Sequence, residues 1–483
     1  MKVLFLNGPF KKLPFSRASR SPAVTKSGTL YYPIFLSYAA GLVDRDGDCD
    51  VRMVDAVAQK MDQADLVDSL RSDPPDLVFC ETSTPSISED IKTAGALKDA
   101  FPACKMVMVG THASSLPQLV LDADHRIDAV ARGEYDQTTL DITNALQSDQ
   151  PFSGIAGITY RNNGQVAHTP DRSLIEDLDS LPFVSQVYHK FLKPRDYFFS
   201  AARYPMVMIM TTRGCPFKCN WCLYPQVAHG ERYRKRSPEN VAAEFTYIAG
   251  QMPQVKEIGI EDDLFTADLK WLRKTCQLLI DQNNPIPFWV DTRITLGYDD
   301  MCLMKRAGCR LLIAGFESAD QQILDNIQKG TKADQAYLFS ADAQKAGLIV
   351  HGCFVFGQPG ETPQTLRNTL EYAKDLNPDT AQFFPMICYP GTRSYNQAKE
   401  QNILRSENYD DWLTDEGGHN ATVDLPGLPG EEVVRFCNQA RREYYLRKRY
   451  IFKKLRQSVT NIHEARRNFK AFKRLARFLV KTP

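Results

Sequence analysis

The feature that most constrains this chain is a group of three cysteines directly after a short apolar segment. Cys215, Cys219 and Cys222 have the spacing C-x3-C-x2-C, and residues 206–211 before them are typical of a β-strand. Iron–sulfur clusters normally take four cysteine ligands, so a loop with three leaves one iron without a protein ligand. Metal sites with an open position are usually catalytic, and closed ones usually structural. We therefore expect a fold that holds a reactive cluster at the end of a strand.

Two other uses of these cysteines are less well supported by the sequence. Disulfides are typical of secreted proteins, and no secretion signal precedes the twelve scattered cysteines of this chain. A structural zinc site needs a fourth ligand, for which His229 is the nearest candidate. Zinc sites usually pair two short ligand motifs, however, and only one such motif is present.

Length and composition indicate an ordinary globular protein of two or three domains. The chain has 483 residues, of which 43% are apolar and 24% are charged. The net charge of +1 argues against a dedicated nucleic-acid partner. We find no signal peptide and no apolar run of the roughly twenty residues that a transmembrane helix needs. The sequence therefore predicts a cytoplasmic protein with reduced cysteines.

Residues 1–150 predict an α/β domain with a doubly wound parallel sheet. Five apolar segments read as strands, at residues 2–6, 51–54, 77–80, 105–109 and 127–130. Segments with helical periodicity lie between them, at residues 32–43, 64–72 and 88–101. Strands that alternate with helices form parallel sheets, and such sheets bind ligands at the carboxyl ends of their strands.

Residues 205–395 show a second alternation, which begins with the strand before the cysteines. Further strands are expected at residues 257–260, 288–290, 311–314, 349–356 and 380–387, with helices between them. In a parallel barrel the cysteine loop would lie at the carboxyl end of the first strand, where the chemistry of such barrels takes place. Polar residues and glycines follow most of the later strands, although turns favour these residues in any case.

The cysteine spacing and the order of these strand ends resemble the radical S-adenosylmethionine (SAM) superfamily, whose core is a partial (βα)6 barrel. The resemblance implies a [4Fe–4S] cluster on Cys215, Cys219 and Cys222, which binds SAM and, when reduced, cleaves it to a 5'-deoxyadenosyl radical. It implies a contact to the SAM amino group for the acidic pair after the second strand, and contacts to the carboxylate, the methionine and ribose, and the adenine or substrate further along. The corresponding residues are Asp262 and Asp263, Arg293, Glu317 and Ser318, and Gly357.

The N-terminal domain resembles the cobalamin-binding domain that precedes many radical SAM cores. The matching phrases are YYPIFLSYAAGL, DLVFCETSTPSISEDIKTAGALK, VMVGTHASSLP and IDAVARGEYDQT. The resemblance makes cobalamin a third cofactor candidate, with Thr82, Ser83, Gly110 and His112 at its site. The D-x-H-x-x-G loop that supplies an axial histidine in cobalamin-dependent mutases is absent, so His112 is either an axial ligand or a polar loop residue. Whether the domain holds cobalamin stays open at this point.

The two remaining segments are a linker and a basic tail. Residues 151–204 predict a β-hairpin with an Asn-Gly turn, followed by an irregular aromatic connector that bridges the domains. Residues 396–483 predict helices at 431–460 and 464–480, and from Arg441 onward carry fifteen Lys or Arg against two Glu. A basic amphipathic helix either lies on an anionic membrane, giving peripheral contact at the inner face, or packs on the barrel with its charges solvated.

The phrases LYPQ, GERYRKRS and TSTPSISEDIKTAGALK resemble radical proteins of hopanoid lipid biosynthesis. The wider group includes the anaerobic magnesium-protoporphyrin monomethyl ester cyclase and cobalamin-dependent methylases. The resemblance implies an oxygen-sensitive biosynthetic enzyme that methylates, rearranges or cyclises a small-molecule or lipid-linked substrate. It also implies an electron donor such as flavodoxin or ferredoxin. The alternative is a non-catalytic sensor that binds a metal cluster or cobalamin, and no catalytic side chain beyond the cluster ligands is assigned.

Overall fold

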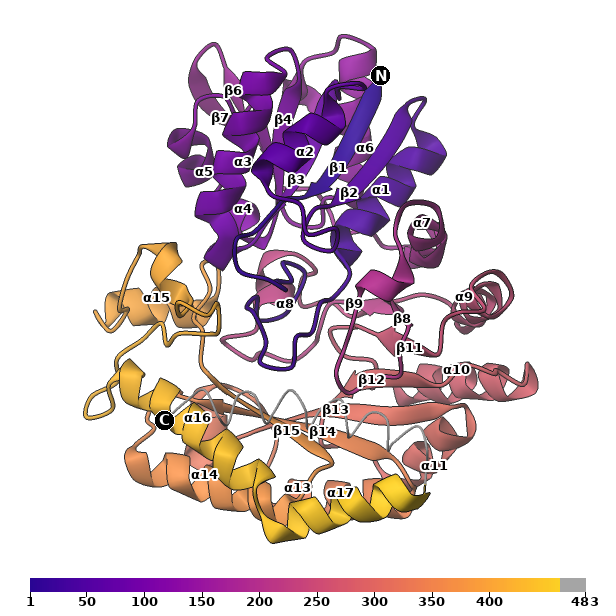
Figure 1. The fold of residues 1–483 in the computed structure, drawn as a ribbon, viewed down its shortest axis with the longest axis vertical. Helices are drawn as coiled ribbons and strands as arrows, with labels where there is room; N and C mark the ends of the chain where they lie inside the picture. The colour runs from indigo at the N-terminus through magenta and orange to yellow at the C-terminus, as the bar shows by residue number, and fades with distance from the viewer. Residues whose placement is uncertain (461–483) are drawn as a thin grey trace.

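The structure, a computed structural model, describes residues 1–460. An N-terminal sheet with helices on both faces lies above a second parallel sheet, and the last helices lie along the far side of that second sheet (Figure 1). The expected fold class, a doubly wound α/β domain followed by a partial barrel and a helical C-terminal segment, is confirmed.

The N-terminal sheet has seven strands in the order β2-β1-β3-β4-β5-β6-β7. The first five are parallel, and β6 and β7 are antiparallel. The predicted hairpin therefore exists, but it extends this sheet beside β5 and is not part of a free linker. The strands are β1 (Lys2–Asn7), β2 (Asp50–Asp55), β3 (Leu77–Thr82), β4 (Lys105–Gly110), β5 (Ala129–Ala131), β6 (Ile158–Asn162) and β7 (Gln165–His168).

Helices cover both faces of this sheet because its central strands are apolar on both sides. Along β1, Val3 and Phe5 belong to one core cluster, and Leu4 and Leu6 belong to the other, as expected for a parallel sheet that is buried on both faces. The two helices between β4 and β5 and the helix after β5 were not predicted. The helices are α1 (Ile34–Asp46), α2 (Gln63–Leu70), α3 (Ile87–Ala100), α4 (Thr111–Ser115), α5 (Pro117–Ala123) and α6 (Asp136–Gln147).

The second sheet contains six parallel strands in the order β15-β14-β13-β12-β11-β8, so its strands follow one another in sequence as the partial barrel requires. A separate two-stranded antiparallel sheet, β9 (Thr212–Arg213) and β10 (Arg234–Lys235), closes the base of the cysteine loop. The six strands are β8 (Met206–Ile209), β11 (Glu257–Ile260), β12 (Phe288–Thr292), β13 (Cys309–Glu317), β14 (Ile349–Phe356) and β15 (Thr380–Pro385).

Four helices of the barrel, α9, α10, α12 and α14, begin at side-chain caps. The Ser237 hydroxyl accepts a hydrogen bond from the Asn240 N–H, and Thr362 caps its helix in the same way; each is followed by a proline, which suits the first helical position. The helices are α8 (Leu223–Val227), α9 (Pro238–Gln251), α10 (Leu269–Asp281), α11 (Tyr298–Arg306), α12 (Gln321–Asn326), α13 (Gln335–Lys345) and α14 (Pro363–Leu376).

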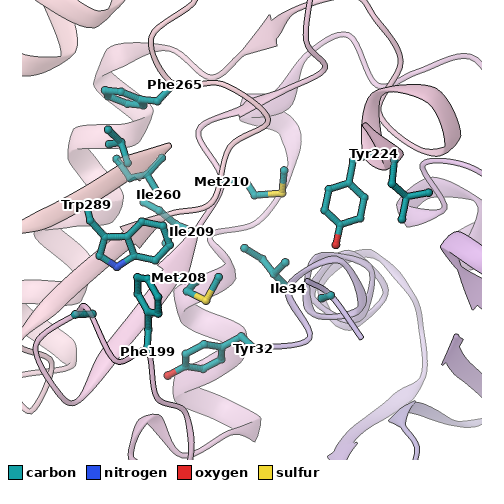
Figure 2. Packing of buried hydrophobic residues seen from close by; sticks show 14 of the residues in the cluster. Tyr32, Ile34, Phe199, Met208, Ile209, Met210, Tyr224, Ile260, Phe265 and Trp289 are labelled. Atoms are coloured by element: carbon teal, nitrogen blue, oxygen red, sulfur yellow. The ribbon is translucent and has the colours of Figure 1, made fainter. Parts of the chain in front are cut away.

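The two α/β units share an apolar core. Tyr32 and Ile34, at the start of α1, lie beside Met208 and Met210, which belong to β8 and the residue after it (Figure 2). The Tyr32 hydroxyl donates to the Met206 carbonyl at 2.9 Å. Because both units contribute to one cluster, the carboxyl ends of the N-terminal strands are held close to the cysteine loop.

Two segments that the sequence left irregular have defined positions. Residues 8–33, between β1 and α1, form a strap that descends toward α8 (Figure 1). It is anchored by the fully buried ion pair of Arg17 with Asp90 and by pairing of Leu30 with Phe198. The predicted connector contains the helix α7 (Val184–Phe191), which packs against α1.

The C-terminal region differs from its prediction. The helix expected over residues 431–460 is two helices, α16 (Gly430–Tyr445) and α17 (Lys448–Thr460), which follow α15 (Arg393–Glu400). The break is stabilised by Arg447, which donates to the carbonyls of Tyr444 and Lys374 at 2.9 and 2.6 Å. The helix predicted over residues 464–480 lies outside the described residues. Among residues 1–460, no helix combines the length and the apolar character needed to cross a bilayer.

Candidate active site

The cysteine loop leaves β9 through a glycine that no other residue can replace without strain. Gly214 has φ +84°, and a Cβ there would lie 2.1 Å from the Arg232 carbonyl oxygen. The Cys215 N–H donates to the Gly230 carbonyl at 3.4 Å. All three predicted ligands, Cys215, Cys219 and Cys222, are half-buried free thiols on this one loop.

A glutamine that the sequence analysis missed holds the loop closed. The side-chain amide of Gln226, on α8, donates to the carbonyls of Cys219, Asn220 and Cys222 at 3.3, 3.1 and 2.7 Å. Its side-chain oxygen accepts from the Arg393 N–H at 2.9 Å. The motif gave no signal for this residue, because its role depends on the turn of chain that brings α8 back under the cysteines.

The structure separates the two predicted acidic residues after β11. Asp262 is fully buried and accepts hydrogen bonds from the N–H groups of Thr211 and Thr212 at 2.6 and 3.0 Å. It therefore ties the end of β11 to the segment that follows β8. Asp263 accepts from the Gly214 N–H at 2.8 Å and from His229 at 2.7 Å, both on Oδ2. Its Oδ1 atom is buried without a hydrogen-bond partner among the described residues. Only Asp263 therefore presents an open acceptor.

Arg20, at the tip of the strap, was not predicted and lies among the acidic strand ends. Its guanidinium is 3.5, 3.7 and 3.6 Å from the carboxylates of Glu261, Asp263 and Asp291. Burial raises the pKa of Glu261 to about 8 and that of Asp291 to about 6, while the Arg20 charge opposes both shifts. For Asp263, burial is outweighed by His229 and Arg20, which lower its pKa to about 2. Asp263 is therefore the firmly ionised acid of this group.

Two further predicted residues, Arg293 and Glu317, lie together beside the cysteine loop. The Arg293 guanidinium lies 3.7 Å from the ring centroid of Phe217, inside the loop, and donates to the Gly330 carbonyl at 3.1 Å. Glu317 has the unusual φ of +62° at a break in the β13–β14 register. It pairs with the buried Lys329 at 2.7 Å, and its Oε2 atom has no hydrogen-bond partner among the described residues. Strained residues of this kind often occur at functional sites.

The structure does not bring Ser318 and Gly357 together with Asp263, Arg293 and Glu317. The Ser318 hydroxyl is buried and lies 3.3 Å from that of Thr369. Gly357 donates its N–H to the buried Glu361 and has φ +83°, and a Cβ there would contact Val433 of α16 at 3.2 Å. Both residues shape loops around the barrel.

A small, partly open cavity lies between the N-terminal strand ends and α8. Its N-terminal wall includes Glu81, Thr82 and Gly110, and its barrel wall includes Tyr224 and His229. Glu81 Oε2 and the Tyr224 hydroxyl are buried there without a hydrogen-bond partner among residues 1–460. The cavity thus offers polar atoms to a ligand that lies between the N-terminal strand ends and α8.

Of the four residues predicted for the cobalamin site, Thr82 and Gly110 line this cavity, and Ser83 and His112 do not. Gly110 allows a close approach, because a Cβ would lie 2.4 Å from the Thr82 carbonyl. Ser83 is fully buried and bonds Ser86 at 2.8 Å. His112 does not line the cavity. It is 2% exposed between Thr84 and the ring of Tyr409, and burial lowers its pKa to about 3, so it is neutral.

A buried charge network joins the two domains beside the cavity. Glu134 and Asp136, which follow β5, bind Arg213 at 2.7 and 2.8 Å. Glu134 also binds Arg234 of β10 at 2.8 Å. Buried ion pairs of this kind are costly to break from one side only, so the network fixes the base of the cysteine loop against the N-terminal domain.

The residues present fit the three groups that the resemblance implies. Three thiols on one loop suit a cluster with an open iron. Asp263 and Glu317 each have a carboxylate oxygen without a partner within residues 1–460, and these oxygens suit the cationic part of SAM. The glycine-lined cavity with its unpartnered polar atoms suits a flat cofactor that carries polar substituents. His229, the fourth ligand that a zinc site would need, is instead hydrogen-bonded to Asp263.

Two family models match this chain. The model of the radical SAM superfamily matches residues 209–373, and the B12 binding domain model matches residues 20–142. An uncharacterised methyltransferase of Pyrococcus horikoshii is 30% identical over 88% of this chain and 90% of its own length. The anaerobic magnesium-protoporphyrin IX monomethyl ester cyclase of Rubrivivax gelatinosus is 28% identical over 74% of this chain and 64% of its own. The hopanoid C-3 methylase of Methylococcus capsulatus is 22% identical over 77% and 70%.

Solved structures share the fold over nearly the whole chain. The radical SAM methyltransferase TsrM from Kitasatospora setae, with cobalamin and a [4Fe-4S] cluster bound, superposes with a TM-score of 0.71 at 16% identity, covering 91% of this chain and 90% of its own. The cobalamin-dependent radical enzyme OxsB, with aqua-cobalamin and SAM bound, gives 0.72 at 13% identity, covering 98% and 72%. At these identities the likeness shows the fold alone.

Proposed function

This chain belongs to the radical SAM superfamily, in the group that carries a B12-binding domain before the barrel, and on this premise we propose that it transfers a methyl group to a carbon atom of a biosynthetic substrate. It is an enzyme of methyltransferase or cyclase type, and its cofactors are a [4Fe-4S] cluster, SAM and cobalamin. The non-catalytic sensor is not favoured, because the named relatives are methyltransferases and cyclases.

The position of the cavity is the observation that favours methyl transfer over rearrangement or cyclisation. The cavity lies at the carboxyl ends of the N-terminal strands, and its other wall includes Tyr224 of α8, the helix that begins directly after Cys222. A cobalamin held there would face the cluster loop, so a methyl donor and a radical source would share one space. Rearrangement or cyclisation needs no methyl donor opposite the cluster, and the arrangement therefore supports methylation over both.

We assign the work of the protein's own residues as follows. Cys215, Cys219 and Cys222 hold the cluster, which when loaded cleaves SAM by one-electron reduction. Asp263 accepts a hydrogen bond from the SAM ammonium group on its Oδ1 atom. Arg293 pairs with the SAM carboxylate, because a guanidinium binds carboxylates in a bidentate manner.

Product analysis of the reconstituted protein tests the proposal. Protein loaded with iron, sulfide and hydroxocobalamin is incubated with SAM and dithionite, and 5'-deoxyadenosine and S-adenosylhomocysteine are measured. Methyl transfer predicts both products, whereas rearrangement or cyclisation predicts 5'-deoxyadenosine alone, and a sensor predicts neither. Cys215→Ala should abolish both products, and Cys49→Ala, a half-buried thiol in the N-terminal domain, should retain them.

The outer surface of α17 supports a lipid-linked substrate. Tyr450 and Lys453 attach this helix to Asp379 at 3.1 and 3.2 Å. Large apolar side chains of this helix are exposed, Ile451 by 45%, Phe452 by 70% and Leu455 by 61%, and Leu446, just before it, is exposed by 53%. The helix thus packs on the barrel through the buried ring of Tyr450 and these polar contacts, and the described residues leave its apolar stripe uncovered. The exposed side of this helix is therefore apolar as well as basic.

We propose that this stripe, with the exposed Lys448 and Arg449 beside it, contacts an anionic membrane from the cytoplasmic side. Sedimentation with vesicles of phosphatidylglycerol and phosphatidylcholine should carry the protein down, and vesicles of phosphatidylcholine alone should carry less. The double variant Phe452→Ser, Leu455→Ser should stay in the supernatant, whereas Leu338→Ser, which removes a 68% exposed leucine of α13, should sediment normally. Equal sedimentation of both variants would defeat the membrane contact.

The cluster also requires a one-electron donor, and we propose an acidic protein such as flavodoxin or ferredoxin. Lys218, between the first two cluster cysteines, is 64% exposed and pairs with Glu231. Reduction by purified flavodoxin should therefore weaken as ionic strength rises.

A further inference from the structure

The two oxygens of Asp263 have different surroundings. Oδ2 accepts from the Gly214 N–H at 2.8 Å and from His229 Nδ1 at 2.7 Å. Oδ1 has no hydrogen-bond partner in the described part of the chain, and the Arg20 guanidinium lies 3.7 Å from it. The side chain is 1% exposed, so water does not supply the missing partners freely. The carboxylate is therefore held by one oxygen and open at the other.

His229 is itself fixed in place. Its ring is 2% exposed and lies against Phe35 and Tyr224, with centroids 5.0 and 5.6 Å away. The backbone N–H of His229 donates to the Tyr224 carbonyl at 2.8 Å. Because the ionised Asp263 can only accept, Nδ1 must carry the hydrogen of this contact. The imidazole therefore acts here as a rigid donor with a single orientation.

The backbone of His229 is tied to the N-terminal domain. Its carbonyl accepts from Arg234 Nη2 at 2.7 Å, and Nη1 of the same guanidinium binds Glu134 at 2.8 Å. Glu134 is 3% exposed and follows β5 of the N-terminal sheet. A continuous set of contacts thus runs from Glu134 through Arg234 and His229 to Asp263.

We propose that His229 is a positioning residue for SAM: it keeps Oδ2 of Asp263 paired with the cysteine loop and so directs Oδ1 to the SAM ammonium group. This rests on the proposed role of Asp263. Without the imidazole the carboxylate can rotate, and the acceptor is no longer held in one direction. Hydrogen bonds to charged groups contribute enough for about a ten- to hundredfold change in an equilibrium constant, so the loss should appear in SAM affinity.

Calorimetric titration of SAM into the reconstituted protein tests this inference. His229→Ala should raise the dissociation constant about tenfold or more, with the iron content per chain unchanged. His229→Asn should restore most of the affinity, because the asparagine amide nitrogen lies at the same distance along the side chain as Nδ1. The matched control is His189→Ala, an exposed histidine whose Nδ1 lies 3.1 Å from the Tyr247 hydroxyl, and it should bind SAM normally.

The outcomes separate the inference from the proposed function. An unchanged dissociation constant for His229→Ala with a full cluster overturns the positioning role. If His229→Ala fails to assemble a cluster, His229→Asn decides: near-normal affinity supports the role, and weak binding with a full cluster overturns it. Wild-type protein that binds SAM normally but forms no S-adenosylhomocysteine would refute methyl transfer and leave the positioning role intact.

Discussion

Replacing Gly214 by alanine should disable the cysteine loop. The residue has φ +84°, a conformation that costs an alanine about 1–2 kcal/mol. The new Cβ would lie 2.1 Å from the Arg232 carbonyl oxygen and 3.1 Å from that of Gly230. Because both obstacles are backbone atoms, the chain must separate, and the hydrogen bond from the Gly214 N–H to Asp263 is lost. A hydrogen bond to a charged group contributes about 1.5–3 kcal/mol.

Together these terms predict a cost of about 2.5–5 kcal/mol, concentrated at the loop. We expect a lower midpoint in urea denaturation and a clear loss of iron bound per chain after reconstitution. The control Gly250→Ala lies within α9, where an added Cβ meets no atom within 4 Å, and it should gain about 0.5–1 kcal/mol. Normal iron binding and an unchanged urea midpoint for Gly214→Ala would refute the reasoning.

Two other perturbations test buried charges. Arg17→Met leaves the fully buried Asp90 without its cation and should cost about 3–5 kcal/mol in urea denaturation; a loss below about 1 kcal/mol would contradict the pair's burial. Burial raises the pKa of Glu361 to about 8, above its unfolded value, so the folded state retains a proton that the unfolded state loses. This term therefore lowers stability as pH rises from about 4.5 to 8, by up to about 1.4 kcal/mol per pH unit, and Glu361→Gln should flatten that slope.

Much of this protein could be predicted from sequence because its signals are local. The strands and most helices follow from short-range periodicity, and the parallel sheets follow from their alternation. The helix break at Leu446 and Arg447 was missed because it depends on contacts of Arg447 with Lys374 and Asn377. The hairpin of β6 and β7 was predicted as an element, but its place at the sheet edge is set by pairing with β5.

The candidate site shows the same division. The ligand role of Cys215, Cys219 and Cys222 is a prediction from spacing alone, and the structure adds the clamp of Gln226 that closes the loop. Asp262 and Asp263 are indistinguishable in sequence, yet they differ in their contacts. Asp262 is bound by the backbone of Thr211, whereas Asp263 binds Gly214 through one oxygen and has no partner for the other among the described residues.

The sequence by itself determined the class of chemistry, since three thiolates at fixed spacing after a strand leave few alternatives. Only the tertiary structure decided which charges surround that chemistry. Arg20, His229 and Glu134 come from three distant segments, and their local sequence does not predict the contacts that they make here. The physical reason is that a metal loop is specified by neighbours along the chain, whereas the burial and pairing of charges depend on which surfaces the whole fold brings together.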